Sequence, residues 1–262
     1  MRGYLKYKFK TITQGLRFKL SSSNNPLFIG YYKYLYRPKP NTISEFLDKY
    51  SKSKNGNVFV IQVGANDGIN NDPVHKYIKR DKWSGILIEP QKYVFEKYLK
   101  KVYSKHKNIE TLCSAIGEED GSQILYKIGW CNMRWATGLS SFQRESLQKA
   151  YDSGLVKNAA KKFDLTLPSN TSQYIVEETV SVISPAILIS KYKVFDIDLL
   201  QIDVEGYDYE VIKMFDLTST KPKNIVYENI HLSEQDKINC EAYLLSLGYK
   251  IKEFDSNTLA EL

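Results

Sequence analysis

Short hydrophobic runs alternate with amphipathic segments along most of this chain. The β-branched run at residues 58–63 is typical of a buried parallel strand. Comparable short runs follow at residues 85–88, 109–115, 180–183, 199–204, 224–228 and 249–254. Between runs, apolar residues return at helical spacing, as in Val94, Phe95, Tyr98, Leu99 and Val102. Strands that alternate with helices predict an α/β fold with a mostly parallel sheet and helices on both faces.

Residues with capping chemistry stand where some of these helices would begin. Asp72-Pro73 resembles an N-cap followed by proline in the first turn, and it predicts a helix that runs to about Arg80. Ser233, with Asp236 three residues later, resembles a capping box and predicts a helix that runs to about Leu247. These signals support the strand–helix reading of the chain.

Charge divides the chain into an arm and a body. Residues 1–44 carry nine Lys or Arg and no acid, and residues 45–262 are nearly neutral, with 28 basic and 30 acidic residues. The arm is rich in aromatic residues and is interrupted at residues 21–26. It is interpreted either as a packed or flexible extension or as a segment that contacts an anionic membrane. No nucleic-acid partner is expected, because no recognised binding motif accompanies the charge.

The body is expected to be one catalytic domain. Within it, residues 120–185 are less regular and are interpreted as an insertion, or cap, over the active site. The three cysteines have no metal-site spacing and suit a reducing compartment. No apolar run approaches the roughly 20 residues of a membrane span, and no secretory signal is visible. We therefore expect a cytoplasmic protein, with peripheral contact at the inner membrane surface as the alternative that the arm leaves open.

Residues suited to ligand binding follow the predicted strands. In parallel sheets, ligands bind beyond the carboxyl ends of the strands. The loop Gly64-Ala65-Asn66-Asp67-Gly68 comes directly after the first strand, and its glycines let the backbone approach a ligand. Glu89 directly follows the second strand, where an acid can accept both hydroxyls of an adenosine ribose. Together they predict a cofactor that contains a nucleoside. The third glycine of a dinucleotide fingerprint is missing, which argues against NAD.

Several segments in this order resemble the FkbM-like S-adenosylmethionine-dependent methyltransferases. The similarity covers about residues 57–254, excludes the arm and is most specific at Ile202–Asp208. The matching segments are Val63–Gly68, Ile88–Pro90, Ser114–Gly117, Ile202–Asp208 and Glu228–His231. The resemblance implies a Rossmann-like class I methyltransferase fold with a seven-stranded sheet. It also implies transfer to the oxygen of a sugar, glycan or glycolipid precursor, as in polysaccharide biosynthesis. Gln62 departs from the family, which usually has an acid at this position.

The resemblance also implies roles for the matched positions. S-adenosylmethionine is the expected cofactor, and Glu89, with Pro90 beside it, would hold its ribose. Asp203 would face both the sulfonium and the acceptor. The loop residues Gly64, Ala65, Asn66, Asp67 and Gly68 would surround the methionine part, and Ser114, Ala115 and Ile116 would border the adenine.

A sugar hydroxyl is a poor nucleophile at neutral pH, so a base within hydrogen-bond reach is expected. The candidates are His231, Glu205 and Asp203. His231 is favoured because histidine ordinarily titrates near neutrality, although it is also interpretable as a structural histidine. Mg²⁺ held by Asp203 and Glu228-Asn229 is possible but is not the favoured reading. The acceptor is expected against Trp130, Trp135, Ser140 and Ser141, which pair aromatic surface with hydroxyls.

One alternative from another functional class remains. The same fold could serve as a catalytically silent module that binds a membrane or an assembly complex through residues 1–44. Intact Gly64, Gly68, Glu89 and Asp203 argue against this alternative. Neither the oligomeric state nor the identity of the acceptor follows from the sequence.

Overall fold

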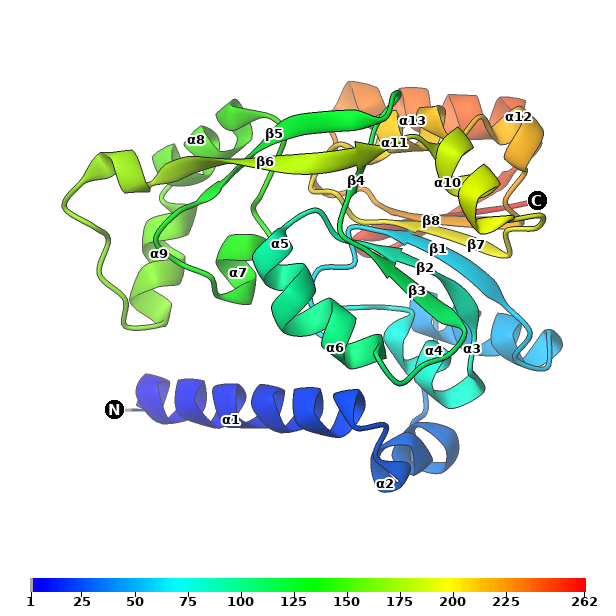
Figure 1. Cartoon of the computed structure of the whole chain (residues 1–262), viewed down its shortest axis with the longest axis horizontal. Coiled ribbons are helices and arrows are strands. Elements are labelled where there is room, and N and C mark those ends of the chain that lie inside the picture. Colours follow the sequence, from blue (N-terminus) through cyan, green and yellow to red (C-terminus); the bar gives the residue numbers. More distant parts are fainter. Residues whose placement is uncertain (1) are drawn as a thin grey trace.

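The computed structural model describes residues 2–262, with side chains from residue 12 onwards, and has a seven-stranded sheet at its centre (Figure 1). The strand order is β3-β2-β1-β7-β8-β10-β9, and β10 is the one strand of this sheet that runs in the opposite direction to the other six. The expected mostly parallel sheet is confirmed. The strands are β1 (Phe59–Val63), β2 (Ser84–Ile88), β3 (Ile109–Leu112), β7 (Leu199–Ile202), β8 (Asn224–Glu228), β9 (Lys250–Phe254) and β10 (Asn257–Glu261).

Alternating side chains along the strands feed two separate cores. In β1, Ile61 and Val63 join the core on one face of the sheet, and Val60 joins the core on the other. The first face is covered by α10 (Pro185–Tyr192), α11 (Asp208–Met214), α12 (Leu217–Thr220) and α13 (Glu234–Ser246). The second is covered by α3 (Ile43–Ser53), α4 (His75–Asp81) and the continuous run of α5 (Lys92–Val94), η2 (Phe95–Leu99) and α6 (Lys100–Tyr103).

Of the two expected N-caps, Ser233 is confirmed, whereas the N-cap of α4 is Val74, without a side-chain capping bond, and not Asp72. Asp72 Oδ1 accepts hydrogen bonds from the backbone amides of Val74 at 2.8 Å and His75 at 2.9 Å. The helix itself begins at His75, slightly later than the Asp72-Pro73 pattern suggested. Ser233 Oγ accepts a bond from the backbone amide of Asp236 at 3.1 Å and caps α13. The Ser233 bond satisfies an amide that α13 leaves unpaired in its first turn, and the two Asp72 bonds satisfy amides where the chain enters α4.

The prediction of a single strand over residues 109–115 was wrong. After β3 the chain leaves the large sheet, and β4 (Ala115–Ile116) pairs with β6 (Ile175–Ile183) in a second sheet. Ser114 Oγ donates to the carbonyl of Ser181 at 3.0 Å, which ties the turning point to β6. The run expected at residues 180–183 is the last part of this longer strand.

The sequence pattern also missed β10. This strand begins with polar residues, Asn257 and Thr258, which conceal its buried character, although Thr258 is fully buried in the sheet. A tight turn at Asp255, with φ +43°, joins β10 to β9. The closing strand expected at the end of the chain is therefore one half of a hairpin.

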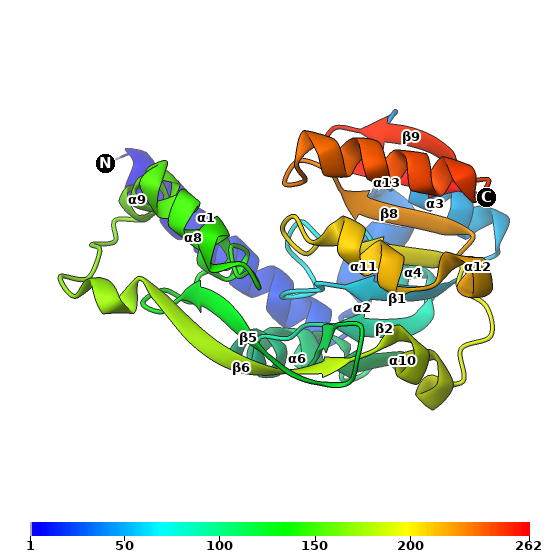
Figure 2. The same ribbon diagram turned by 90° about the horizontal axis from the view of Figure 1, so that it is seen from above.

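Most of residues 120–185 form a unit beside the large sheet. The second sheet has the order β4-β6-β5, with β5 at Gly121–Ile128. β5 and β6 form a long ribbon that leads away from the large sheet towards α8 and α9 (Figure 2). The helices of this unit are α7 (Arg134–Thr137), α8 (Arg144–Asp152) and α9 (Leu155–Lys162), with a 3-10 turn, η3 (Thr171–Gln173). Ile128, Cys131, Ala136, Leu147 and Val156 make its own small core.

The N-terminal arm is helical, and its end is packed. It consists of α1 (Arg2–Ser22), α2 (Pro26–Gly30) and the π-helical turn η1 (Tyr31–Leu35), and α1 lies along one edge of the molecule (Figure 1). The buried Lys79 ammonium donates to the Ser21 carbonyl at 3.2 Å, to Asn24 Oδ1 at 2.8 Å and to the Val102 carbonyl at 2.7 Å. In the described part of the chain, no helix has the length and apolar character that crossing a bilayer requires.

Candidate active site

A narrow cavity lies beyond the carboxyl ends of β1, β2 and β7, where sheets of this type bind ligands. The loops after these strands supply Gly64, Glu89 and Asp203, and the unit of residues 120–185 supplies much of the facing wall. The cavity measures about 60 Å³. Its lining consists of Gly64, Asn66, Glu89, Pro90, Gln91, Leu125, Arg134, Thr137, Gly138, Ser140, Ser141, Phe142, Asp203, Val204 and Glu205.

Gly64 lets two strand ends come together. Its φ is +80°, and a Cβ at this position would lie 1.9 Å from the carbonyl oxygen of Asp203. A side chain cannot be accommodated there without moving the backbone of the loop after β7. The glycine at the start of the loop is therefore required by the approach of Asp203.

Glu89 is buried beside this loop with both carboxylate oxygens engaged. Oε2 accepts a hydrogen bond from the backbone amide of Asn66, and Oε1 accepts one from the amide of Gln91, both at 2.9 Å. Burial raises the pKa of Glu89 to about 7, against the lowering effect of these two bonds. Each oxygen keeps a lone pair for a further donor, so the carboxylate is positioned to accept hydroxyls from a ligand.

Three other predicted loop residues shape the turn. Asp67 Oδ1 accepts bonds from the amides of Ile69 at 2.9 Å and Asn70 at 2.8 Å, so its carboxylate is turned back onto its own loop. Gly68 packs against aromatic and aliphatic side chains from the 92–103 helix, and Ala65 is buried. Asp67 still borders an adjoining cavity of about 460 Å³, which shares Asn66 and Arg134 with the narrow one.

The predicted adenine-bordering residues lie elsewhere. Ser114 is buried with its hydroxyl bonded to main-chain carbonyls, and Ala115 and Ile116 form β4. None of the three is among the residues that line the five cavities described for residues 12–262. Their proposed contact with adenine stays a prediction.

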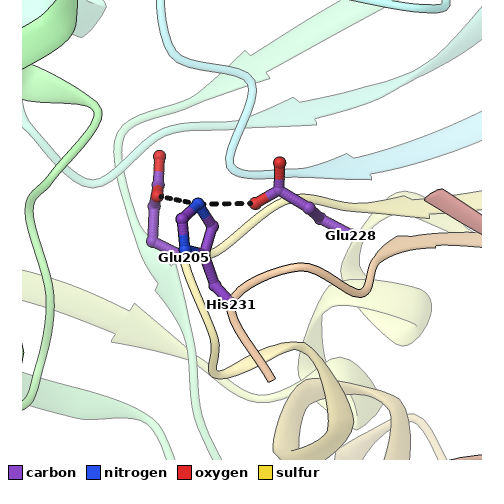
Figure 3. A group of neighbouring side chains, drawn as sticks. All are labelled: Glu205, Glu228 and His231. Carbon is purple, nitrogen blue, oxygen red and sulfur yellow. Dashed lines mark ion pairs between the residues drawn. The ribbon is translucent and has the colours of Figure 1, made fainter. Parts of the chain in front are cut away.

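A second group of functional side chains meets next to Asp203. His231 Nε2 lies 3.3 Å from Glu205 Oε2 and 3.6 Å from Glu228 Oε2, between the two carboxylates (Figure 3). Glu205 follows β7, Glu228 ends β8, and His231 lies in the loop before α13. Glu228 and His231 are three residues apart, and the fold brings Glu205 to them from the loop after β7, at the same sheet edge as Gly64 and Glu89.

Two residues of the Ile202–Asp208 segment, Gly206 and Asp208, hold the loops that carry this group close together. Gly206 has φ +99°, and a Cβ there would lie 2.8 Å from the carbonyl of His231, so glycine allows the two loops to touch. Asp208 is fully buried and accepts bonds from the amides of Gly206 at 3.2 Å and Glu228 at 3.4 Å. Asp208 therefore links the Glu205 loop to the end of β8.

The carboxyls of this group repel one another in a buried environment. Burial and the charge of Asp203 raise the pKa of Glu205 to about 8. Burial and the charges of Asp203 and Glu205 raise the pKa of Glu228 to about 8. Burial also raises the pKa of Asp203. Strongly shifted carboxyls in a cleft are typical of sites that handle protons or bind cations.

Arg134 is the functional candidate that the sequence reasoning missed. It begins α7, borders four of the five cavities and lowers the pKa values of Glu89, Asp203, Glu205 and Glu228 through its charge. Its buried Nε has no hydrogen-bond partner. No sequence pattern marks this arginine, because its position among acids from three other segments exists only after folding.

The predicted acceptor residues separate into two groups. Ser140 and Ser141 line the narrow cavity, and Ser140 Oγ donates to Gln91 Oε1 at 3.1 Å. Trp135 lines a neighbouring cavity of about 530 Å³ together with Glu205 and His231. Trp130 lines neither; its ring nitrogen donates to the Tyr151 hydroxyl at 2.9 Å, as a packing residue would.

Gln62 stands where an acid was expected, and an acid lies next to it. Gln62 is buried on β1, and hydrogen bonding from its side chain contributes to lowering the pKa of Asp72. The larger effect is burial, which raises that pKa to about 6. Two buried acceptors at this position, Gln62 Oε1 and Asp72 Oδ2, have no hydrogen-bond partner.

A family model described as the methyltransferase FkbM domain matches residues 62–251. None of the curated proteins gives a significant match. Among solved structures, the methyltransferase FkbM from Methylobacillus flagellatus is similar, with 13% identity, a TM-score of 0.47, and coverage of 79% of this chain and 44% of that one. The chain thus spans less than half the length of that protein.

Two further structures are similar at lower TM-scores. The O-methyltransferase from Bacillus cereus, in complex with SAH, shares 9% identity over 89% of this chain and 96% of its own, with a TM-score of 0.37. Fibrillarin from Methanococcus jannaschii shares 12% identity over 91% of this chain and 74% of its own, with a TM-score of 0.40. Because these scores are below 0.5, family membership depends on the sequence match.

Proposed function

Because this chain belongs to the FkbM family of S-adenosylmethionine-dependent methyltransferases, we propose that it methylates a hydroxyl oxygen of a sugar, glycan or glycolipid precursor. Its sheet has the strand order of the Rossmann-like class I methyltransferase fold. The observation that carries the proposal is the meeting of Glu205, Glu228 and His231 beside Asp203, at the sheet edge that also holds Gly64 and Glu89.

The residues around the narrow cavity fit the cofactor. Glu89 offers a buried carboxylate for ribose hydroxyls, and the buried oxygen Asn66 Oδ1 has no partner of its own. The cavity alone is smaller than the roughly 300 Å³ at which ligand pockets begin, but the adjoining space of about 460 Å³ shares Asn66, Arg134 and Thr137 with it. When bound, S-adenosylmethionine supplies a methyl group that its sulfonium has already activated.

The protein's own part is to hold the acceptor and take its proton. We assign the base to His231, whose ring lies between two carboxylates and lines the cavity of about 530 Å³. As the new oxygen–carbon bond forms and the carbon–sulfur bond breaks, the hydroxyl proton passes to the imidazole. An ionised carboxylate beside the ring stabilises the imidazolium that results, which is the role we give to Glu205 in the form that dominates above its pKa of about 8. Trp135, on the wall of the same cavity, offers a flat apolar surface for a sugar ring.

Binding and transfer are tested separately. The wild-type chain should bind S-adenosylhomocysteine in calorimetry and transfer labelled methyl groups to one of a set of candidate glycans. His231→Gln should reduce turnover by about 100-fold, the scale of general-base catalysis, with unchanged affinity for S-adenosylhomocysteine. Glu89→Gln is the matched control that should lose affinity. Unchanged turnover in His231→Gln would remove the histidine from this role.

The same calorimetry tests the silent-module alternative. A chain that folds but binds no S-adenosylhomocysteine would favour a binding function on the methyltransferase fold.

A divalent cation is the second candidate for activating the acceptor. One ligand atom each from Glu205, Glu228 and His231 lies within 4.8 Å of the others. This donor set differs from the one suggested by the sequence: both include Glu228, but Glu205 and His231 take the place of Asp203 and Asn229. A bound cation would lower the pKa of a hydroxyl that it contacts. Activity that survives exhaustive EDTA treatment would exclude this route and leave the histidine as base.

A further inference from the structure

The N-terminal arm exposes a set of large apolar side chains. We define the arm surface as Ile12 and Leu16 on α1 together with Leu27, Tyr31, Tyr34 and Leu35 on α2 and η1. Leu27 is 86% exposed and Leu35 is 71% exposed. Exposed apolar residues in the rest of the described chain are spread over several distant segments. Soluble proteins rarely gather such residues without a partner.

The spacing within each helix places these residues on one side. Ile12 and Leu16 are four residues apart, and Leu27, Tyr31, Tyr34 and Leu35 follow at steps of about one helical turn. Other side chains of the same helices pack inwards. The rings of Phe18 and Tyr98 lie 5.5 Å apart, and Tyr32 is buried with its ring 6.0 Å from that of His75. Each helix therefore has a packed side and an exposed apolar side.

All the charged residues of the arm are basic. Residues 1–44 contain no acid. Exposed basic side chains accompany the apolar ones, namely Lys19, Lys33, Arg37 and Lys39. An apolar helix side flanked by lysine and arginine matches the boundary of a bilayer with anionic headgroups, which takes up apolar side chains and attracts cations.

We propose that the arm surface docks on an anionic lipid membrane, lying in its interface. A second copy of the chain and a nucleic acid are the competing occupants. A nucleic acid would use the positive charge but leave the apolar side chains in water. A second copy would bring two basic arms together and place like charges opposite one another. A membrane is the partner that satisfies both features.

Docking there would also place the candidate active site near the lipid. The same helix that carries Ile12 and Leu16 contributes Thr13, Gln14 and Arg17 to the lining of the cavity that holds His231. An acceptor carried on a lipid would reach this cavity from the membrane side. This last step rests on the proposed function, whereas the docking itself does not.

The test is flotation of the full chain with vesicles. The wild-type chain should float with phosphatidylcholine vesicles that contain 30% phosphatidylglycerol, and release should increase as salt is raised. Leu27→Gln with Leu35→Gln should weaken partitioning about tenfold or more, because both lose apolar burial. Lys33→Gln with Arg37→Gln should weaken binding and its dependence on salt. Leu155→Gln with Phe195→Gln, also exposed but outside the arm, is the matched control and should bind as wild type.

Several results would overturn the proposal. One is that the wild-type chain, shown by circular dichroism to be folded, does not float with the vesicles. Another is that it floats equally well with pure phosphatidylcholine. A third is that Leu27→Gln with Leu35→Gln partitions as strongly as the control. Loss of a dimer in sedimentation velocity on Leu27→Gln with Leu35→Gln, without vesicle binding, would assign the surface to a second copy. A gel shift with labelled RNA and no vesicle binding would assign it to nucleic acid. Because flotation needs no cofactor, its failure is distinguishable from failure of S-adenosylhomocysteine binding.

Discussion

At the scale of single residues, the candidate site is characterised by buried carboxyl groups with raised pKa values. Glu89 illustrates the conflict between folding and function, because it is 2% exposed and burial raises its pKa to about 7. Between its ordinary value of 4.5 and about pH 7, the folded protein binds more protons here than the unfolded chain does. The free energy of unfolding contributed by Glu89 therefore falls as pH rises through that window. Hydrogen bonds from a bound ligand would offset the loss of stability that comes with ionising the buried carboxyl.

We expect the affinity for S-adenosylhomocysteine to depend on this carboxyl. Ionised Glu89 accepts ribose hydroxyls at both oxygens, whereas the protonated form offers less, so binding should weaken as pH falls below about 7. Near pH 6 the affinity should be about tenfold lower than at pH 8, as one pH unit below a pKa implies. Calorimetry at the two values measures it, with Glu89→Gln as the control whose weak binding should change little. An affinity that stays constant from pH 6 to 8 would contradict the assignment.

At the scale of elements, one buried cation fastens the arm to the body. Lys79 on α4 donates to oxygens of Ser21, Asn24 and Val102, and burial lowers its pKa to about 8. Ser21 Oγ also lies 3.2 Å from His75 Nε2, on the same helix as Lys79. The end of α1 is thus joined to α4 and α6 by polar contacts in a buried place. The charge of the arm suggested an extension, and its packed end depends on residues far along the chain.

Removing this cation should loosen the arm. Lys79→Met keeps most of the side-chain volume but leaves three acceptors without their donor, which we expect to cost about 3 kcal/mol of the free energy of unfolding. Urea denaturation measures the loss, and limited proteolysis should cut residues 22–41 sooner than in wild type. Lys49→Met, at an exposed lysine on α3, is the control and should change stability by less than about 0.5 kcal/mol. Equal protease resistance of the two variants would show that Lys79 does not hold the arm.

At the scale of the whole molecule, the candidate site is formed between parts that are distant in the chain. The loops after β1, β2 and β7 make one wall, and residues 125–142 make much of the opposite wall. α1 then borders the adjoining cavities. Arg134 lies at the centre of this arrangement, among acids contributed by the large sheet.

Cofactor binding should therefore order two separate segments together. S-adenosylhomocysteine should slow amide hydrogen exchange in residues 64–71 and in residues 132–142, because the cavity lies between them. The hairpin of β9 and β10 takes no part in the narrow cavity and should exchange at the same rate with and without ligand. Protection of the first segment alone would mean that residues 132–142 do not close over the cofactor.

The sequence by itself determined the features that are local along the chain. Strand runs, the cap at Ser233, and the positions of Gly64, Glu89 and Asp203 directly after strands are all visible there, because hydrogen-bonding chemistry and side-chain period act over a few residues. The order of strand-end motifs was enough to identify the family. The departure of the chain after β3 was missed because the partner strand β6 is far along the chain, and β10 was missed because it begins with polar residues.

Only the tertiary structure decided which side chains meet and which face water. Glu228 and His231 are close in the sequence, but Glu205 comes from another segment and meets them because parallel strands end at one sheet edge. Arg134 lines the candidate site only because α7 packs over that edge. The arm's composition indicated charge, but the exposure of Leu27 and Leu35 beside the buried Tyr32 depends on how the helices pack. Distances and exposure are properties of the packed chain, and no local pattern encodes them.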